Sequence, residues 1–190
     1  LGTGARGSDI KVAENAQCDE TLLGHILKIE TKISESGLLL QSIKSYSKGH
    51  RNPQGLKIIA DRLLSVEHGP RHGDEVNQIK LNGNYGWPKF SHGIPYDTDI
   101  AVKTFRNVGQ YISPIFHFTP SIGISDLAAC PFTEDIIYSN CILVSSMKDA
   151  SYYILKIESD KSQLNIVSAE RLYLGDRIRK ILSKKKYNLF

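Results

Sequence analysis

The residues best suited to hold a ligand are concentrated in one stretch, Gly49–Pro88. Within it, His50-Arg51-Asn52-Pro53-Gln54-Gly55 places a guanidinium, two amides and an imidazole beside a proline, which keeps the preceding residue in extended geometry. This pattern predicts a rigid loop that presents polar groups. His50 and Gln54 are interpreted as supports of the loop. For Arg51 and Asn52 the alternative is a surface ion pair, which would contribute little.

The same stretch holds candidate ligands for a metal ion. Glu67-His68-Gly69-Pro70 follows an apolar run, and a Gly-Pro pair there can present successive carbonyl oxygens. Carbonyl oxygens are hard ligands of the kind that Ca²⁺ prefers. Asp74 and Glu75 then supply carboxylates. The only tryptophan, Trp87, follows in a glycine-rich turn and is predicted to be a packing anchor whose N–H is hydrogen-bonded.

Two arginines near the other end of the sequence point to an anionic ligand. Arg177 and Arg179 are expected in or beside a strand, where alternation would send both side chains to the same face. Two like charges so placed are unfavourable unless an anion lies nearby. The short run Lys184–Lys186 is interpreted as a solvated end, because it is too short to indicate nucleic-acid binding.

The elements that would position these residues are mostly β-strands. Short apolar or alternating runs recur between turn-forming residues, which favours a sandwich, a barrel or a propeller. The pentapeptide Ile26–Glu30 recurs unchanged as Ile154–Glu158, at a spacing of about three propeller blades of ~40–45 residues, and this favours the propeller. Loops are expected at Ser8–Glu20 and Lys32–Leu38. The predicted strands are Ile26–Thr31, Leu63–Val66, Glu75–Leu81, Ile115–Phe118, Ile136–Ser146, Tyr152–Glu158, Asn165–Leu172 and Ile178–Leu182.

Length and composition are those of one globular domain. The chain has 190 residues, 41% of them hydrophobic, and a net charge of +4. No apolar run approaches the ~20 residues of a membrane span. Cys18, Cys130 and Cys141 are widely spaced, without a CxxC pair. They are interpreted as buried or unpaired thiols, and one disulfide remains an alternative.

Three motifs carry a resemblance to a known family. GHRNPQGL, EHGPRHGDE and NGNYGWP, in this order and at these spacings, resemble the signature of the glucose/sorbosone dehydrogenase family. Its members are soluble aldose sugar dehydrogenases that depend on pyrroloquinoline quinone (PQQ), and their fold is a six-bladed β-propeller. The resemblance implies an all-β fold in which residues 1–190 form a single partial propeller domain of roughly four blades. It also implies PQQ and Ca²⁺ as cofactors, an aldose sugar as substrate and an external electron acceptor.

The resemblance also assigns site residues. PQQ carries three carboxylates, which an arginine fork is suited to bind. The carbonyl oxygens of Gly69 and Pro70 are implied to hold a Ca²⁺ that touches the cofactor, and Glu75 and Tyr85 are implied to help bind a second, structural Ca²⁺. The implied cofactor contacts are Arg51, Asn52, Thr119, Lys148, Arg177 and Arg179.

Several family features are missing or altered. Ala5 stands where the family has an acidic cofactor-site residue, and Lys180 also replaces an acidic residue. The family's general base, a histidine, lies upstream of the turn that Leu1–Gly7 resembles. No catalytic residue is therefore expected in this chain, which resembles a C-terminal fragment.

The resemblance implies a periplasmic or secreted enzyme that oxidises aldoses to lactones by hydride transfer to the quinone. The main alternative is a non-catalytic propeller that binds carbohydrate or protein, because a fold does not fix an activity. A nucleic-acid-binding module is a third alternative, which no motif supports.

Overall fold

The computed structural model describes residues 1–5, 10–94, 96, 110–130, 140–160 and 162–182. These residues form eleven β-strands in three sheets, together with the short helix α1 (Ile10–Glu14) and one turn of 3-10 helix, η1 (Asn15–Gln17). The predominance of strands confirms the all-β prediction for this part of the chain. The predicted strand residues 136–139 and the lysine run 184–186 lie outside it. Within the described residues, no helix is long and apolar enough to cross a membrane.

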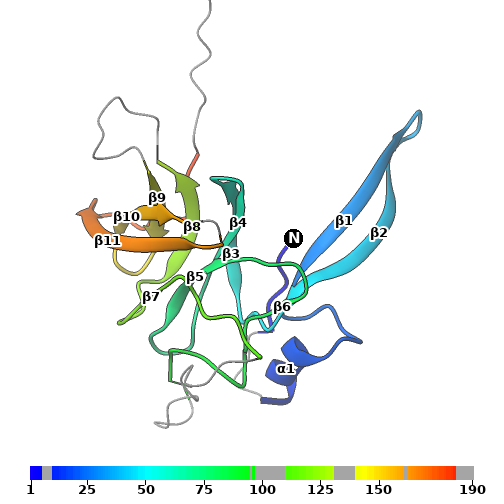
Figure 1. Cartoon of the computed structure of the whole chain (residues 1–190), viewed down its shortest axis with the longest axis horizontal. Helices are drawn as coiled ribbons and strands as arrows, with labels where there is room; N and C mark the ends of the chain where they lie inside the picture. Colours follow the sequence, from blue (N-terminus) through cyan, green and yellow to red (C-terminus); the bar gives the residue numbers. More distant parts are fainter. Residues whose placement is uncertain (6–9, 95, 97–109, 131–139, 161, 183–190) are drawn as a thin grey trace, which may run out of the picture.

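The first sheet is a long hairpin that projects from the body of the molecule (Figure 1). It consists of β1 (His25–Ser34) and β2 (Gly37–Lys48), which are antiparallel, and of β6 (Gly83–Asn84), which runs parallel to the end of β2. The loop expected at Lys32–Leu38 is wrong, because the two strands continue to a tight turn between Ser34 and Gly37. The alternation of apolar and polar residues was not recognised in the sequence, because polar residues stand at the exposed ends of both strands.

The second and third sheets each have four strands. The second has the order β3-β4-β5-β7, with β3 (Pro53–Ile59), β4 (Arg62–Glu67), β5 (Asp74–Gln78) and β7 (Phe116–Phe118). The third has the order β11-β10-β9-β8, with β8 (Ile124–Ala129), β9 (Cys141–Ser146), β10 (Ser151–Ser159) and β11 (Leu164–Tyr173). Strands β3 and β8 were not predicted, because β3 begins with Pro-Gln-Gly and β8 contains a buried aspartate.

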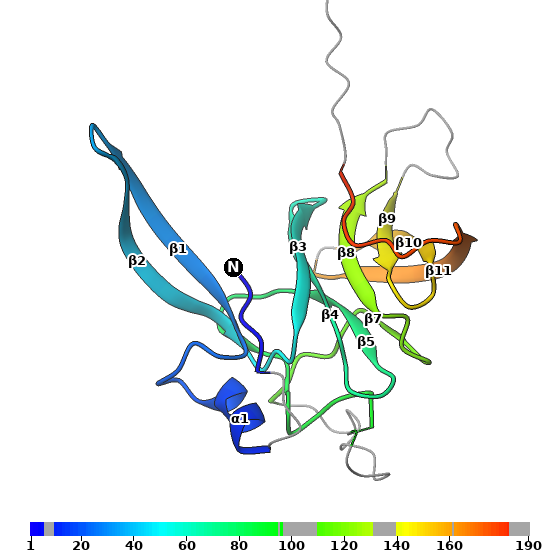
Figure 2. The ribbon, with the colours of Figure 1, turned by 180° about the vertical axis from the view of Figure 1, so that it is seen from behind.

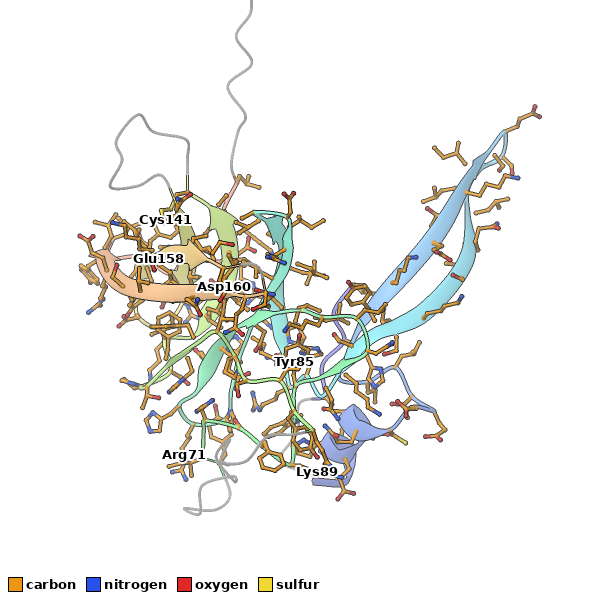
Figure 3. The ribbon with its side chains drawn as sticks, in the orientation of Figure 1. Arg71, Tyr85, Lys89, Cys141, Glu158 and Asp160 are labelled. Carbon is orange, nitrogen blue, oxygen red and sulfur yellow. A yellow bond between two sulfur atoms is a disulfide. The ribbon has the colours of Figure 1, made fainter. Side chains whose placement is uncertain are left out.

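The main core lies between these two sheets, where β8 packs on β3 and β4 (Figure 2). A smaller cluster of Ile26, Ile79 and Tyr85 joins the base of the hairpin to the second sheet. Figure 3 shows Tyr85 near the middle of the molecule, between these two elements. The main core consists of Ile59, Leu64, Val66, Val76, Phe118, Ile122, Ile124, Leu127, Ile142, Val144, Leu155, Ile157 and Leu164.

Two further expectations can be compared with the structure. The repeated pentapeptide lies in β1 and in β10, so both copies are strands, but they belong to the first and third sheets. Its spacing therefore corresponds to two sheets and not to three blades. Cys130 and Cys141 form a disulfide, the alternative that the sequence left open, while Cys18 is not disulfide-bonded.

The strand predicted at Ile178–Leu182 is wrong. Residues 174–182 have no strand partner and cross the end of the third sheet through scattered hydrogen bonds, among them those from Ile178 N to Ser146 O and from Ile181 N to Asp126 Oδ2. The apolar residues Ile178 and Ile181 had suggested a strand. Without strand alternation, Arg177 and Arg179 need not share a face.

Candidate functional site

A cavity of about 650 Å³ opens where β4 turns into β5. Its volume is typical of small-molecule sites. Figure 3 shows one of its lining residues, Arg71, at the lower left, well below Cys141 of the third sheet. The lining includes three Lys or Arg side chains, two histidines and one carboxylate, so the wall carries net positive charge and suits an anionic ligand. It is lined by Arg51, Asn52, His68, Gly69, Arg71, His72, Asp74, Tyr96, Ser121, Gly123 and Lys148.

The loop between β2 and β3 brings Arg51 to the cavity. Gly49 begins this loop with a φ of 80°, which favours glycine, and a Cβ at this position would lie 2.4 Å from Asn84 Oδ1. The Arg51 side chain is 7% exposed, and its Nη1 donates a hydrogen bond of 3.2 Å to His68 O. Its Cζ lies 5.3 Å from the centre of the Trp87 ring, a cation–π distance that fixes the direction of the guanidinium.

Trp87 is held in turn by the first residues of the chain. Its Nε1 donates a hydrogen bond of 3.1 Å to Ala5 O, which confirms the prediction of a hydrogen-bonded anchor. Ala5 N donates to Arg51 O at 3.0 Å. Position 5 therefore contacts Arg51 through the backbone, and its side chain is a buried methyl group.

Glu67, at the end of β4, anchors the Arg51 loop. Its Oε2 accepts hydrogen bonds from Arg51 N at 2.8 Å and from Asn52 N at 3.4 Å. Its Oε1 accepts a bond of 2.8 Å from Asn77 Nδ2 and lies 3.0 Å from His50 Nδ1. The side chain is 2% exposed. A buried carboxylate is stable only when it is paired or hydrogen-bonded, and here most of its partners belong to the loop that it fixes.

His50 and Gln54 support the same loop, as predicted. His50 is buried, its Nε2 lies 2.9 Å from Ser47 Oγ, and its ring stacks on Tyr85 with 4.6 Å between ring centres. Gln54 Nε2 donates a hydrogen bond of 3.1 Å to Asn52 Oδ1. This bond orients the Asn52 amide at the cavity wall.

Asp74, the first residue of β5, connects two walls of the cavity. Its Oδ2 accepts hydrogen bonds from the backbone N–H groups of Ile122, Gly123 and Ile124 at 2.8–3.1 Å, and its Oδ1 accepts one from Gly69 N at 3.2 Å. Burial alone would raise the pKa of Asp74, but the nearby His68 and these N–H donors lower it below its ordinary value. The carboxylate therefore stays charged while it holds the backbone.

The turn that contains Gly69 and Pro70 is buried beside Asp74. A Cβ on Gly69 would lie 2.2 Å from Gly73 O, so no larger residue fits this turn without moving the backbone. Gly69 lines the cavity and Pro70 packs behind it against Gly93. Backbone carbonyls remain as the oxygen ligands that this turn can offer.

Glu75 and Tyr85, the predicted ligands of a second Ca²⁺, line a small void next to Glu67. Burial and the neighbouring Glu67 raise the pKa of Glu75 well above its ordinary value. The Tyr85 hydroxyl donates to Gln78 O at 2.6 Å and accepts from Lys80 N at 2.8 Å, so its oxygen is already occupied by the backbone. In the described part of the chain, no three His, Cys, Asp or Glu side chains gather to hold a metal ion.

Lys148 and Arg177 lie together at a second hollow of about 440 Å³, which shares Gly123 and Lys148 with the first cavity. Lys148 Nζ donates a hydrogen bond of 3.2 Å to Ser121 O. Arg177 lines the same hollow. The structure thus brings Arg51, Lys148 and Arg177 around adjoining spaces.

Thr119 and Arg179 are placed differently. Thr119 is exposed and does not line the cavity, whereas the nearby Ser121 does. Arg179 lines neither hollow, but its Nη1 donates to the Sδ atom of Met147, a lining residue of the second hollow, at 3.2 Å. Lys180 Nζ lies 3.8 Å from Oδ2 of the buried Asp126, so this basic residue is paired with a carboxylate.

Sequence reasoning missed most of the supporting residues. Glu67 and Asp74 were noted as part of a motif but not as backbone anchors, and Asp126, which accepts from Ile181 N, was not identified as an anchor either. Arg71 and His68 line the cavity without having been singled out. One available signal was an acidic residue at the border of an apolar run, where burial requires hydrogen-bond donors nearby.

Strands in stacked antiparallel sheets, with a ligand-sized cavity at their ends, define this chain as part of a β-propeller. All of its residues, 1–190, match the family described as Glucose / Sorbosone dehydrogenase, and the chain belongs to this family.

Similar proteins agree with this placement. Quinoprotein glucose dehydrogenase B of Acinetobacter calcoaceticus is 38% identical over 139 residues, which are 70% of this chain and 28% of that protein. Aldose sugar dehydrogenase YliI of Escherichia coli (strain K12) is 29% identical over 155 residues, which are 78% of this chain and 39% of that protein. The chain therefore spans well under half of either relative.

A solved structure of a glucose dehydrogenase superimposes with a TM-score of 0.72 at 29% identity, over 88% of this chain and 50% of that one. This likeness confirms the predicted propeller fold.

Proposed function

We propose that this chain forms the PQQ- and Ca²⁺-binding part of an oxidoreductase that converts aldose sugars to lactones. The observation that carries the proposal is the positively charged cavity between the Arg51 loop and the Gly69–Pro70 turn. The names of the relatives, a quinoprotein glucose dehydrogenase and an aldose sugar dehydrogenase, support the same chemistry.

The cavity residues fit a ligand with several carboxylates. The Arg51 guanidinium offers paired donors, and Lys148 and Arg177 offer two further cations at the adjoining hollow. The only carboxylate in the cavity lining, Asp74, directs both oxygens to backbone N–H groups. At the cavity an anionic ligand would therefore meet mainly cations, while the lining of the adjoining hollow also includes Asp176.

The Gly69–Pro70 turn fits a Ca²⁺ beside that ligand, because carbonyl oxygens are suitable ligands and Asp74 fixes the turn from behind. When bound, PQQ would supply a two-electron acceptor and Ca²⁺ a Lewis acid that polarises it. Arg51 and Lys148 would orient the acceptor, and Glu67 would hold Arg51 in place. By resemblance, no residue of this chain is assigned as the base that takes the sugar's hydroxyl proton. Cofactor binding is therefore proposed for this chain and sugar oxidation for the whole protein.

A periplasmic or secreted location is part of the proposal. The disulfide between Cys130 and Cys141 supports it, because disulfides persist mainly in oxidising compartments.

The test is a titration of the chain with PQQ in the presence of Ca²⁺, followed by the fluorescence of Trp87. This residue is the only tryptophan and lies against Arg51. We expect saturable quenching that weakens when Ca²⁺ is chelated. Loss of a charge-assisted hydrogen bond costs about 1.5–3 kcal/mol, so Arg51→Ala and Lys148→Ala should each weaken binding at least about tenfold.

Arg62→Ala is the matched control. Arg62 lies at the far end of β4, where it donates to Asp160 O, and its replacement should leave PQQ affinity unchanged. Equal affinities of the Arg51→Ala variant and the unmodified chain would refute the site. Saturable binding of an aldose without any PQQ binding would favour the alternative, a non-catalytic propeller.

A further inference from the structure

Two of the six histidines form a pair outside the candidate site. The rings of His92 and His117 are stacked, with 4.0 Å between their centres and an angle of 8° between their planes. Neither residue lines the cavity or its adjoining hollow. Two of the other histidines are buried and two line the cavity; they are His25, His50, His68 and His72.

His117 belongs to β7, the last strand of the second sheet (Figure 1). Its neighbour Phe118 points into the main core, so alternation along the strand turns His117 to the opposite face. The side chain is exposed. Among the residues that the structure describes, no strand pairs with β7 on its outer side. The imidazole is therefore accessible to a small solute.

His92 comes from residues 91–94, a segment that the backbone holds in place. Ile94 and Arg71 exchange two backbone hydrogen bonds of 2.9 Å and 2.7 Å, and Gly93 N donates to Ser91 Oγ at 3.1 Å. Burial and the neighbouring His117 lower the pKa of His92 to about 4. At neutral pH its imidazole is therefore neutral, which is the state that binds metal ions.

The distance between the two rings is close to that of two ligands of one metal ion. Bonds from Zn²⁺ to imidazole nitrogen are about 2.0–2.1 Å long, so a shared ion holds two nitrogens about 3 Å apart. The ring centres are 4.0 Å apart, and rotation about each Cβ–Cγ bond would turn one nitrogen toward the partner ring. Imidazole suits Zn²⁺, Cu²⁺ and Ni²⁺, whereas Ca²⁺ prefers oxygen ligands.

The histidines stand on two segments that enclose the end of the Gly69–Pro70 turn. Gly73 N donates a hydrogen bond of 2.9 Å to the carbonyl oxygen of Phe118, the residue after His117. On the other side, a Cβ on Gly73 would lie 2.7 Å from the nitrogen of Gly93, the residue after His92. A metal ion bound to both rings would therefore join the segments on either side of Gly73.

We propose that His92 and His117 bind one late divalent transition-metal ion of the Zn²⁺ or Ni²⁺ kind, which fastens residues 91–94 to β7. Water would complete the coordination, so the affinity should lie below that of zinc sites with three or four protein ligands. This site is separate from the proposed PQQ and Ca²⁺ sites. It does not depend on whether either of them is occupied.

The test is a calorimetric titration of the chain with Ni²⁺ in buffer that contains excess Ca²⁺, which supplies oxygen-lined sites with the ion they prefer. We expect one saturable Ni²⁺ site. His92→Asn and His117→Asn each remove one ligand and should weaken binding at least about tenfold. His72→Asn is the matched control, because His72 is exposed and asparagine tolerates its φ of 68°. This variant should keep the affinity of the unmodified chain.

Hydrogen exchange tests the fastening of the two segments. At a free Ni²⁺ concentration of about ten times Kd, an opening that releases the ion becomes about tenfold rarer. The amides of Arg71, Gly73 and Ile94 should therefore exchange up to about tenfold more slowly with Ni²⁺, and this change should disappear in the His117→Asn variant.

Three results would overturn the proposal. The first is the lack of a saturable Ni²⁺ site in the unmodified chain. The second is unchanged affinity in the His117→Asn variant, whose exposed position is unsuited to cause a folding defect. The third is equal weakening by His72→Asn and His92→Asn, which would place the ion in the cavity and not at the histidine pair.

Discussion

Replacing Glu67 with alanine removes the acceptor of four hydrogen bonds from a position that is 2% exposed. The Arg51 N–H loses its only strong partner, at 2.8 Å. Asn77 Nδ2 keeps a second bond to Glu75 Oε2 at 3.2 Å, so its loss is partial. His50 can move its proton to Nε2 and still bond to Ser47.

A buried donor without a partner costs about 1–3 kcal/mol. One full loss, at Arg51 N, and two partial losses, at Asn77 Nδ2 and at the longer bond from Asn52 N, therefore give about 3 kcal/mol for Glu67→Ala. This is a large share of the about 5–15 kcal/mol that stabilises a typical domain. Glu67→Gln keeps one oxygen for the Arg51 N–H and removes the charge beside Glu75, so we expect a loss of about 1 kcal/mol. Urea unfolding followed by Trp87 fluorescence and circular dichroism measures both values.

Gln78→Ala is the matched control for this experiment. The Gln78 side chain is 6% exposed and also bridges backbone groups, accepting from Leu164 N and donating to Ser162 O, but it lies away from the cavity. It should cost a similar free energy of unfolding without speeding hydrogen exchange at the Arg51 amide. The anchoring role is refuted if Glu67→Ala changes stability by less than about 0.5 kcal/mol, or if Arg51 exchanges equally fast in both variants.

Three other predictions concern different parts of the molecule. Burial and the neighbouring His117 lower the pKa of His92 to about 4. The folded state therefore loses stability as the pH falls from 6.5 towards 4. In the His92→Asn variant, the urea midpoint should depend less on pH over this range. Cys141→Ser opens a disulfide whose cysteines are 11 residues apart and should cost about 3 kcal/mol in urea unfolding under oxidising conditions. Asp126→Asn weakens the acceptor of the Ile181 N–H and should speed its hydrogen exchange.

Each of these predictions has a contrary result. If the urea midpoint falls equally steeply with pH in the His92→Asn variant and in the unmodified chain, protonation of His92 does not cause the loss of stability in acid. Equal stability of Cys141→Ser and the oxidised chain would mean that the bridge constrains nothing. Unchanged exchange at Ile181 would show that its backbone bond does not hold residues 174–182.

The strands that carry core residues were predictable from the sequence, because alternation records burial. Leu63–Val66 and Tyr152–Glu158 were placed within a few residues of β4 and β10. The strands at the hairpin tip were not predicted. Their residues are exposed on both faces in this chain, so no alternation between buried and exposed positions marks them. The strand predicted at Ile178–Leu182 was wrong for the opposite reason. Ile181 is buried at the end of a sheet, but residues 178–182 do not pair as a strand.

The candidate site divides in the same way. Arg51 and Gly69 could be named from the sequence, because a motif marks them and the structure brings both to one cavity. Thr119 was named by resemblance and lies outside it. The contacts that hold the site, such as that from Gly123 N to Asp74 Oδ2, join residues far apart in the chain. No local pattern records a partner at such a distance.

Three buried carboxylates show how this fold can keep a positively charged cavity in shape. Glu67, Asp74 and Asp126 each stand on a strand, and each accepts backbone N–H groups from a segment that reaches the cavity or its adjoining hollow. Asp74 accepts four backbone N–H groups, Glu67 two and Asp126 one, so these carboxylates fix the loops before a ligand arrives. The side chains of Arg51 and Lys148 line the cavity that these loops form. Ligand binding then needs little loop ordering, which is the condition for high affinity in a small site.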